Sequence, residues 1–153
     1  MGQPNDVQKK LPMIGHAQGL CYAFDSLYVV VNSRSSSTGA GVFRLIDTKQ
    51  DDKFDKIITI KKLSAPGGEH GPHAIIPAPD GKHLYVVMGN QTPLPDDYTH
   101  SRVPELWGED QLYPSLQYFM KGAVAPLGHF AQIDPEGKTW EIMSTGFRHQ
   151  YDA

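Results

Sequence analysis

The stretch Leu27-Tyr28-Val29-Val30-Val31-Asn32 recurs 57 residues later as Leu84-Tyr85-Val86-Val87-Met88-Gly89-Asn90. Runs of β-branched and aromatic residues of this length are typical of strands. An apolar segment precedes each copy, and Ala17-Gln18-Gly19-Leu20 takes the place that His73-Ala74-Ile75-Ile76 has in the second copy. A turn signal follows each segment, and it is strongest at Pro79-Asp80-Gly81-Lys82. Each copy therefore predicts a strand, a turn and a second strand.

Two further strands are expected in each copy. They are Gly41–Asp47 and Lys56–Ile60 in the first, and His129–Asp134 and Thr139–Met143 in the second. Four short antiparallel strands per repeat are the plan of a β-propeller blade. The sequence therefore predicts an all-β chain, residues 1–153, with two four-stranded blades at about 15–63 and 70–146.

An insertion at 91–128 interrupts the second copy and carries five prolines. We expect it to leave the blade, to include a short helix near 111–120, and to pack over the mouth of the channel through Trp107 and Tyr113. Residues 147–153 read as the start of a further blade. Two blades cannot close a propeller, which has roughly 4–8, so we expect an incomplete propeller that is part of a larger protein.

Composition restricts the function. Of 153 residues, 39% are hydrophobic and 20% charged, which is typical of a globular chain. The net charge of -3 and the lack of a basic run give no reason to expect nucleic-acid binding, and no apolar stretch is long enough for a membrane span. The single cysteine, Cys21, is expected to be a small buried residue. No Cys-x-x-Cys-His motif is present, so we expect no haem site in this chain.

Polar residues gather in Gly67-Gly68-Glu69-His70-Gly71-Pro72-His73-Ala74, immediately before a predicted strand. His70 and His73 with Glu69 could act as a general base and its neighbours, could bind a metal, or could merely bond the backbone of a turn. A histidine also stands near the start of each blade, at His16, His73 and His149. This recurrence favours a ring of histidines at one end of the propeller axis.

The stretch from Glu69 to Asn90 resembles the segment around the catalytic histidine of the soluble quinoprotein glucose/sorbosone dehydrogenases. Gly146-Phe147-Arg148-His149-Gln150 resembles their quinone-contacting Gly-x-Arg-Asn segment. The sequence of these segments most resembles the large haem-linked, membrane-bound-dehydrogenase-like proteins of planctomycetes and their relatives. The resemblance implies a six-bladed propeller that binds pyrroloquinoline quinone and Ca²⁺.

By this resemblance His70 is the general base, and Glu69 is its acidic neighbour on the cofactor side. His73, Arg148 and His149 also match cofactor-binding positions, while Asn90 matches a residue near the metal. Three of these residues depart from the family pattern. His73 replaces an arginine, Asn90 an aspartate and His149 an asparagine.

Other charged residues could assist the cofactor. Arg102 and Lys121 could join Arg148 in pairing with the carboxylates of the quinone, while Glu109 and Asp110 could supply oxygen ligands to Ca²⁺.

The expected function is quinone-dependent oxidation of a small-molecule sugar or alcohol. The resemblance implies that further blades, and a cytochrome c domain, accompany this chain in a periplasmic or secreted parent protein. Since a propeller site is built from several blades, we expect the isolated chain to be inactive. Two alternatives stay open: a non-catalytic propeller that serves as a binding module, and a metal-dependent lactonase-like hydrolase.

Overall fold

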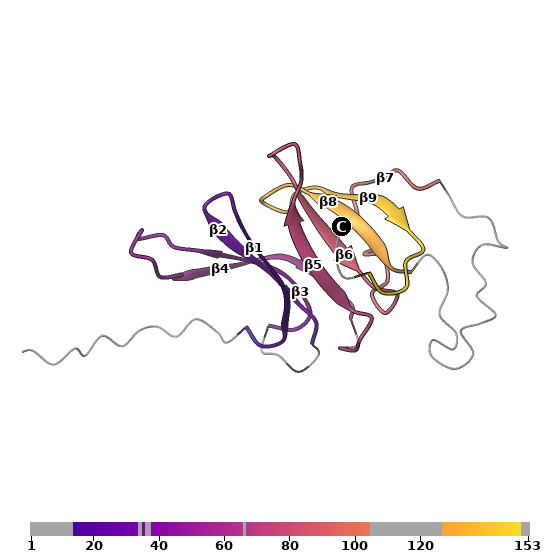
Figure 1. Ribbon diagram of the computed structural model, residues 1–153, viewed down its shortest axis with the longest axis horizontal. Helices are drawn as coiled ribbons and strands as arrows, with labels where there is room; N and C mark the ends of the chain where they lie inside the picture. The colour runs from indigo at the N-terminus through magenta and orange to yellow at the C-terminus, as the bar shows by residue number, and fades with distance from the viewer. Residues whose placement is uncertain (1–13, 34, 36–37, 66, 105–126, 151–153) are drawn as a thin grey trace, which may run out of the picture.

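The computed structural model describes residues 14–33, 35, 38–65, 67–104 and 127–150. Strands connected by turns and bends make up this part of the chain (Figure 1). None of the described residues belongs to a helix that could cross a membrane. The predicted all-β class is therefore confirmed, and the expected helix near 111–120 lies outside the described residues.

The first sheet is antiparallel and contains four strands in sequence order, β1-β2-β3-β4. They are β1 (Ala17–Ala23), β2 (Ser26–Val31), β3 (Gly41–Ile46) and β4 (Lys56–Lys62). Phe24 and Asp25 connect β1 to β2 and both have a φ of 50°. Positive φ at both central residues is the signature of a tight hairpin turn whose twist matches that of the strands.

The second sheet has the order β5-β6-β8-β9-β7. Its strands are β5 (Pro72–Pro77), β6 (Leu84–Met88), β7 (His100–Ser101), β8 (His129–Ile133) and β9 (Trp140–Thr145). Four of them form the predicted antiparallel meander. The two-residue β7, from the insertion, adds a fifth strand that the sequence did not predict, and it pairs in parallel with β9 at the outer edge.

The strand registers show how the two repeats correspond. Tyr28 and Tyr85 lie opposite Cys21 and Ile76, so the offset of 57 in β2 and β6 falls to 55 in β1 and β5. The difference arises because the turn between β5 and β6 is longer. Both first strands have a bulge, after Ala17 and after Pro72. The counterpart of His73 is therefore Gln18, one residue from the position that sequence alignment gives.

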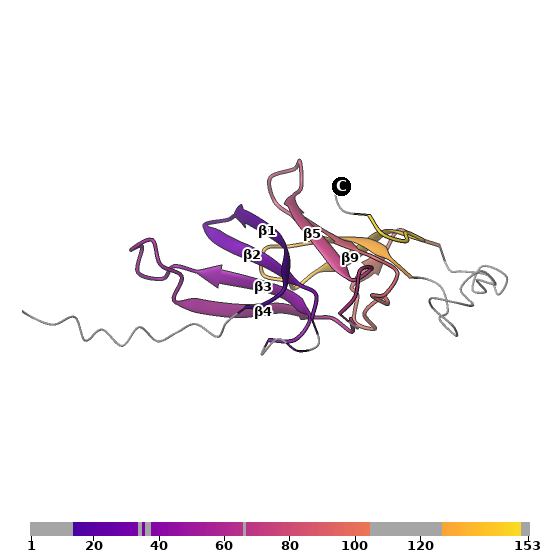
Figure 2. The ribbon, with the colours of Figure 1, turned by 60° about the horizontal axis from the view of Figure 1, so that its bottom comes forward.

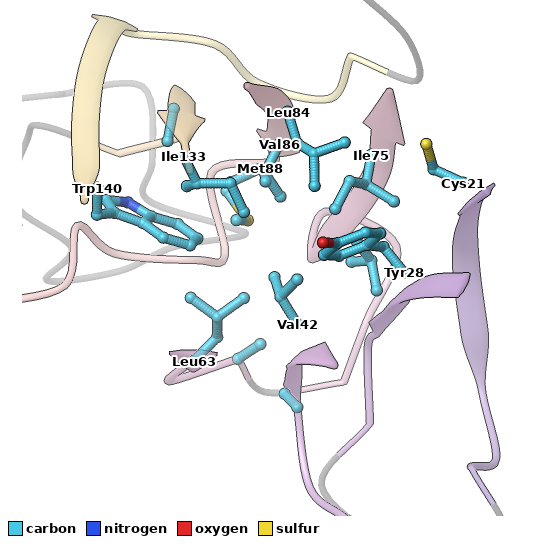
Figure 3. Packing of buried hydrophobic residues seen from close by; sticks show 14 of the residues in the cluster. Cys21, Tyr28, Val42, Leu63, Ile75, Leu84, Val86, Met88, Ile133 and Trp140 are labelled. Carbon is cyan, nitrogen blue, oxygen red and sulfur yellow. The ribbon is translucent and has the colours of Figure 1, made fainter. Parts of the chain in front are cut away.

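The two sheets pack face to face, with β1 beside β5 (Figures 1 and 2). Figure 3 shows Tyr28 and Val42 of the first sheet pointing toward Met88 and Trp140 of the second. The buried side chains of this common core are Cys21, Tyr28, Val30, Ala40, Val42, Leu63, Ala65, Ile75, Leu84, Val86, Met88, Ala131, Ile133, Trp140 and Ile142. The prediction that Cys21 is a small buried residue is confirmed, and burial raises the pKa of its thiol.

Polar contacts fix one sheet relative to the other. The Tyr28 hydroxyl donates to the backbone carbonyl of Pro135 at 2.9 Å, in the turn between β8 and β9. Arg44 lies 3.5 Å from the Glu136 carboxylate in the same turn. Because the Tyr28 bond is part-buried and joins residues distant in sequence, it selects one relative placement of the sheets.

His129 is a fully buried histidine in the second sheet, and burial lowers its pKa to about 4. In the unfolded chain the pKa of this histidine is near 6.5, so the unfolded chain binds the proton more readily than the folded chain. Stability should therefore be complete above pH 6.5 and fall by about 3 kcal/mol as the pH falls to 4. Urea unfolding of His129→Gln should show a smaller fall across this window, since glutamine does not titrate.

The exposed His100 provides the matched control for this prediction, as His100→Gln makes the same substitution at the surface. Its pH profile should follow that of the original chain. Equal pH profiles for His129→Gln and the original chain would contradict the assigned protonation.

Candidate functional site

The pairing of β5 with β6 brings His70 and Asn90 together. The two residues flank this antiparallel hairpin, whose ladder continues past the strands through Gly89 N–H to the Gly71 carbonyl at 2.8 Å. Gln91 N–H then donates to the His70 carbonyl at 2.9 Å. The side chains meet beside this ladder, where His70 Nδ1 lies 2.8 Å from Asn90 Oδ1, and both residues are buried.

The segment after β9 completes the cluster. Asn90 N–H donates to the Arg148 carbonyl at 2.9 Å, which anchors this segment beside His70. The ring of His149 then stacks on His73, with centroids 4.5 Å apart and planes inclined by 19°. It also meets the His70 ring at a centroid distance of 4.5 Å. Two segments distant in sequence, one at the start of β5 and one after β9, thus place His70, His73 and His149 in one imidazole cluster.

Burial disfavours the charged form of His73. Desolvation lowers the pKa of its ring most, and the neighbouring His149 and His70 lower it further, while a hydrogen bond with the backbone of Glu69 acts in the opposite direction. A neutral imidazole can stack on His149 without charge repulsion. His73 is therefore suited to support its neighbours rather than to pair with an anion.

Glu69 and Arg148 contribute to the cluster through their backbones, whereas their side chains are exposed. Their charged groups therefore face the solvent beside the imidazoles. Of the six predicted site residues, four thus have side chains buried or half-buried in one cluster: His70, His73, Asn90 and His149.

His16 does not belong with the other histidines. It is exposed, and its carbonyl accepts from Asn32 N–H at 3.2 Å, just as the Gly71 carbonyl accepts from Gly89 N–H. The register therefore makes His16 the counterpart of Gly71. His16 and His73 therefore do not occupy equivalent positions in their sheets, because the second hairpin is longer than the first.

The first sheet supplies a residue to the site that sequence reasoning did not identify. Asn32 Nδ2 donates to the Gly68 carbonyl at 2.6 Å, and a Cβ at Gly71 would overlap with the Asn32 carboxamide. Glycine at 71 is thus required for the two blades to approach here. The position of Asn32 at the end of the repeated Val-Val-Val stretch, close to where Asn90 ends the second, was the available signal.

Polar atoms without a partner remain at this end of the sheets. Within the described residues, Asn32 Oδ1 and both side-chain polar atoms of Gln150 are buried and make no hydrogen bond. Such atoms are rare in folded proteins and normally have a partner. A hollow of about 460 Å³ opens nearby between the sheets and is lined by Ser33, Ala40, Leu63, Ser64, Ala65, Gln91 and Pro93.

Few of the described side chains are arranged to bind the expected cofactors, calcium and the quinone. No group of three histidine, cysteine or acidic side chains in the described ranges is arranged to hold a metal ion. Asn90 Oδ1 is already bound to His70, and Glu69 is exposed. Arg102 pairs with Glu141 at 2.7 Å, where β7 and β9 form the edge of the sheet opposite to β5. The side chains of the described residues therefore do not form a calcium site by themselves.

The insertion begins and ends close to the cluster. Gln91 Oε1 accepts from His70 N–H at 3.2 Å, and Pro93 forms a β-bridge with Leu127. The other residues named for this insertion, Trp107, Glu109, Asp110, Tyr113 and Lys121, lie outside the described residues.

No family model matches this chain, and it matches no curated protein and no solved structure. The chemistry of the imidazole cluster therefore has to be inferred from its own geometry.

Proposed function

We propose that this chain carries the general base of a quinoprotein-type dehydrogenase that oxidises a sugar or an alcohol, with His70 as that base. The contact between His70 Nδ1 and Asn90 Oδ1 at 2.8 Å supports this proposal most directly. An amide oxygen only accepts hydrogen bonds, so Nδ1 carries the proton. The neutral ring then has its basic lone pair on Nε2, as a general base requires.

The proposed step is removal of the proton from the substrate hydroxyl by His70 Nε2, while hydride leaves the adjacent carbon. A quinone held by the completed ring would accept this hydride, and the residues described here would supply the proton acceptor, His70 Nε2. Asn90 fixes the orientation of the base, as an aspartate does in many sites, but it leaves the ring without a neighbouring negative charge.

His149 and Arg148 have supporting roles beside the His70 ring. His149 lies against both His70 and His73, so it holds the two rings in a fixed relation. The exposed guanidinium of Arg148 is available for an anionic group such as a cofactor carboxylate. This arrangement restricts the His70 ring before substrate binds, and such positioning is a large part of enzymatic rate enhancement.

A binding module without catalysis is the second candidate. The observation in its favour is that His70 and His73 are both almost fully buried. A buried histidine that is bonded to an amide can have a purely structural role, in which it stabilises a turn. In that case the imidazole cluster supports a surface that binds a glycan or peptide.

Dye-linked oxidation of aldoses and simple alcohols, with quinone and Ca²⁺ supplied, distinguishes the two candidates. We expect turnover when further blades complete the ring, and none from a single copy of the chain, because two blades provide the base without the remaining contacts. Arg102→Ala, at the outer edge, is the control and should leave turnover unchanged. Binding of a sugar by the complete ring without any oxidation would favour the binding module instead.

A further inference from the structure

The first sheet has a second apolar face, directed away from the common core. Val29, Val31 and Phe43 form a separate cluster there, with the partly buried Ile14, Leu27, Leu45 and Ile57 packed against it. Leu20 and Tyr22 of β1 extend this face and are 64% and 67% exposed. Large apolar side chains this exposed, next to an apolar cluster, are characteristic of an interaction surface.

The contact between the two sheets within one chain shows which kind of surface packs on a face of this type. The first sheet contributes Tyr28 and Val30 to the common core, whereas the second contributes Val86 and Met88. By the 57-residue offset, Val86 and Met88 are the counterparts of Val29 and Val31 on the outward face. The sheets therefore pack head to tail, with the Tyr28 face of one blade on the Val29-type face of the other.

The same equivalence holds in the other strands. Ile75 is buried in the core, and its counterpart Leu20 is exposed on the outward face. Ala131 and Trp140 are likewise in the core, whereas their counterparts Phe43 and Ile57 belong to the outward cluster. The outward face of the first sheet thus matches, strand by strand, a surface that is covered in the second sheet.

The complementary surface is present on the outward side of the second sheet. Tyr85 is the counterpart of Tyr28, and Phe130 is the counterpart of Val42. Both are half-buried, whereas Val87, the counterpart of Val30, is already covered within the chain. The rings of Tyr85 and Phe130 lie 4.8 Å apart. Each copy of the chain therefore presents the Val29-type face on one side and, through Tyr85 and Phe130, part of the Tyr28-type face on the other.

We propose that copies of this chain associate head to tail, with the Tyr85 face of one copy packed on the Leu20–Val29 face of the next. The continuity with the internal interface selects a second copy as the partner. Tyr85 would then approach the turn between β3 and β4 of its neighbour, as Tyr28 approaches the turn at Pro135. Contacts of this heterologous kind close into a ring or extend into a filament, and three copies would supply six sheets.

Sedimentation velocity of the 153-residue chain over a range of concentrations is the first test. We expect species larger than one copy. Leu20→Lys and, separately, Tyr85→Glu should each weaken association by at least about tenfold, because each places a charge in the proposed contact. Tyr98→Lys, at a residue 43% exposed outside both faces, is the matched control and should associate like the original chain.

Mixing the two weakened variants tests the head-to-tail geometry itself. The Leu20→Lys chain keeps its Tyr85 face, and the Tyr85→Glu chain keeps its Leu20 face. Native mass spectrometry of the mixture should therefore show a dimer that contains one chain of each variant, whereas each variant alone should remain a single copy. Circular dichroism and thermal unfolding of each variant establish that it is folded.

Three results would overturn the proposal. The original chain could remain a single copy at about 100 μM, a concentration at which contacts of micromolar affinity are saturated. Alternatively, folded Leu20→Lys could associate as strongly as the original chain. In the third case the two weakened variants would fail to combine when mixed, which points to a symmetric contact instead.

Discussion

His70→Ala should lower kcat of the proposed dehydrogenase, once further blades complete it, by ~10²–10⁴, the usual contribution of a general base. The alanine variant lacks the proton acceptor, so the hydroxyl proton has to leave to water. KM should change little, because the loss concerns the transition state rather than the binding of the hydroxyl. Steady-state kinetics with a saturating electron-accepting dye measures both quantities.

His70 is buried and bonded to Asn90, so its removal also perturbs local packing. His70→Gln is therefore the second variant, since it keeps a polar side chain of similar length without a basic lone pair. It should lose kcat to a similar extent while unfolding near the temperature of the original protein. Full activity in either folded variant would refute the role of His70 and leave the binding module as the better explanation.

Much of the fold could be predicted because its local and global signals agree. The Leu-Tyr-Val-Val stretches are β2 and β6, and the predicted third and fourth strands are β3, β4, β8 and β9. Strand formers occur in short runs between turn residues, so local propensity alone locates the strands. The strand order of each meander follows because consecutive strands joined by short turns pair with one another.

Features that depend on long-range pairing could not be predicted in this way. β7 is only two residues, His100–Ser101, and it exists because the backbone of Thr99 and Arg102 bonds to Trp140 and Ile142. Nothing in the local sequence indicates a partner 41 residues away. The one-residue error at His73 has a similar origin, because turn length and a bulge together set the register.

The sequence identifies several residues of the candidate site but does not predict the contacts between their side chains. The sequence indicates that His70 and Asn90 flank a hairpin, but it does not show that their side chains bond. The same uncertainty applies to His149, whose contact with His73 requires the segment after β9 to return beside β5. Asn32 belongs to the other repeat, so only the packing of the two sheets reveals its contact with Gly68.

Trp140→Ala should be the most destabilising of the simple truncations in the common core. The indole is 1% exposed and lies in the core between the two sheets (Figure 3). The ammonium group of Lys61, from β4 of the first sheet, also lies 5.3 Å from its ring centre. Truncating a buried tryptophan removes its apolar contacts and leaves a cavity, which together cost about 3–5 kcal/mol.

Urea unfolding followed by far-UV circular dichroism measures this loss without relying on tryptophan fluorescence. Trp140→Phe should recover a large part of the stability, because a phenyl ring refills most of the cavity. Tyr98→Ala removes an exposed aromatic ring and should change stability by no more than about 0.5 kcal/mol. A loss for Trp140→Ala as small as that of Tyr98→Ala would mean that the two sheets are not held together by this core. The internal interface would then be too weak to repeat between copies, and the proposed head-to-tail association would lose its structural basis.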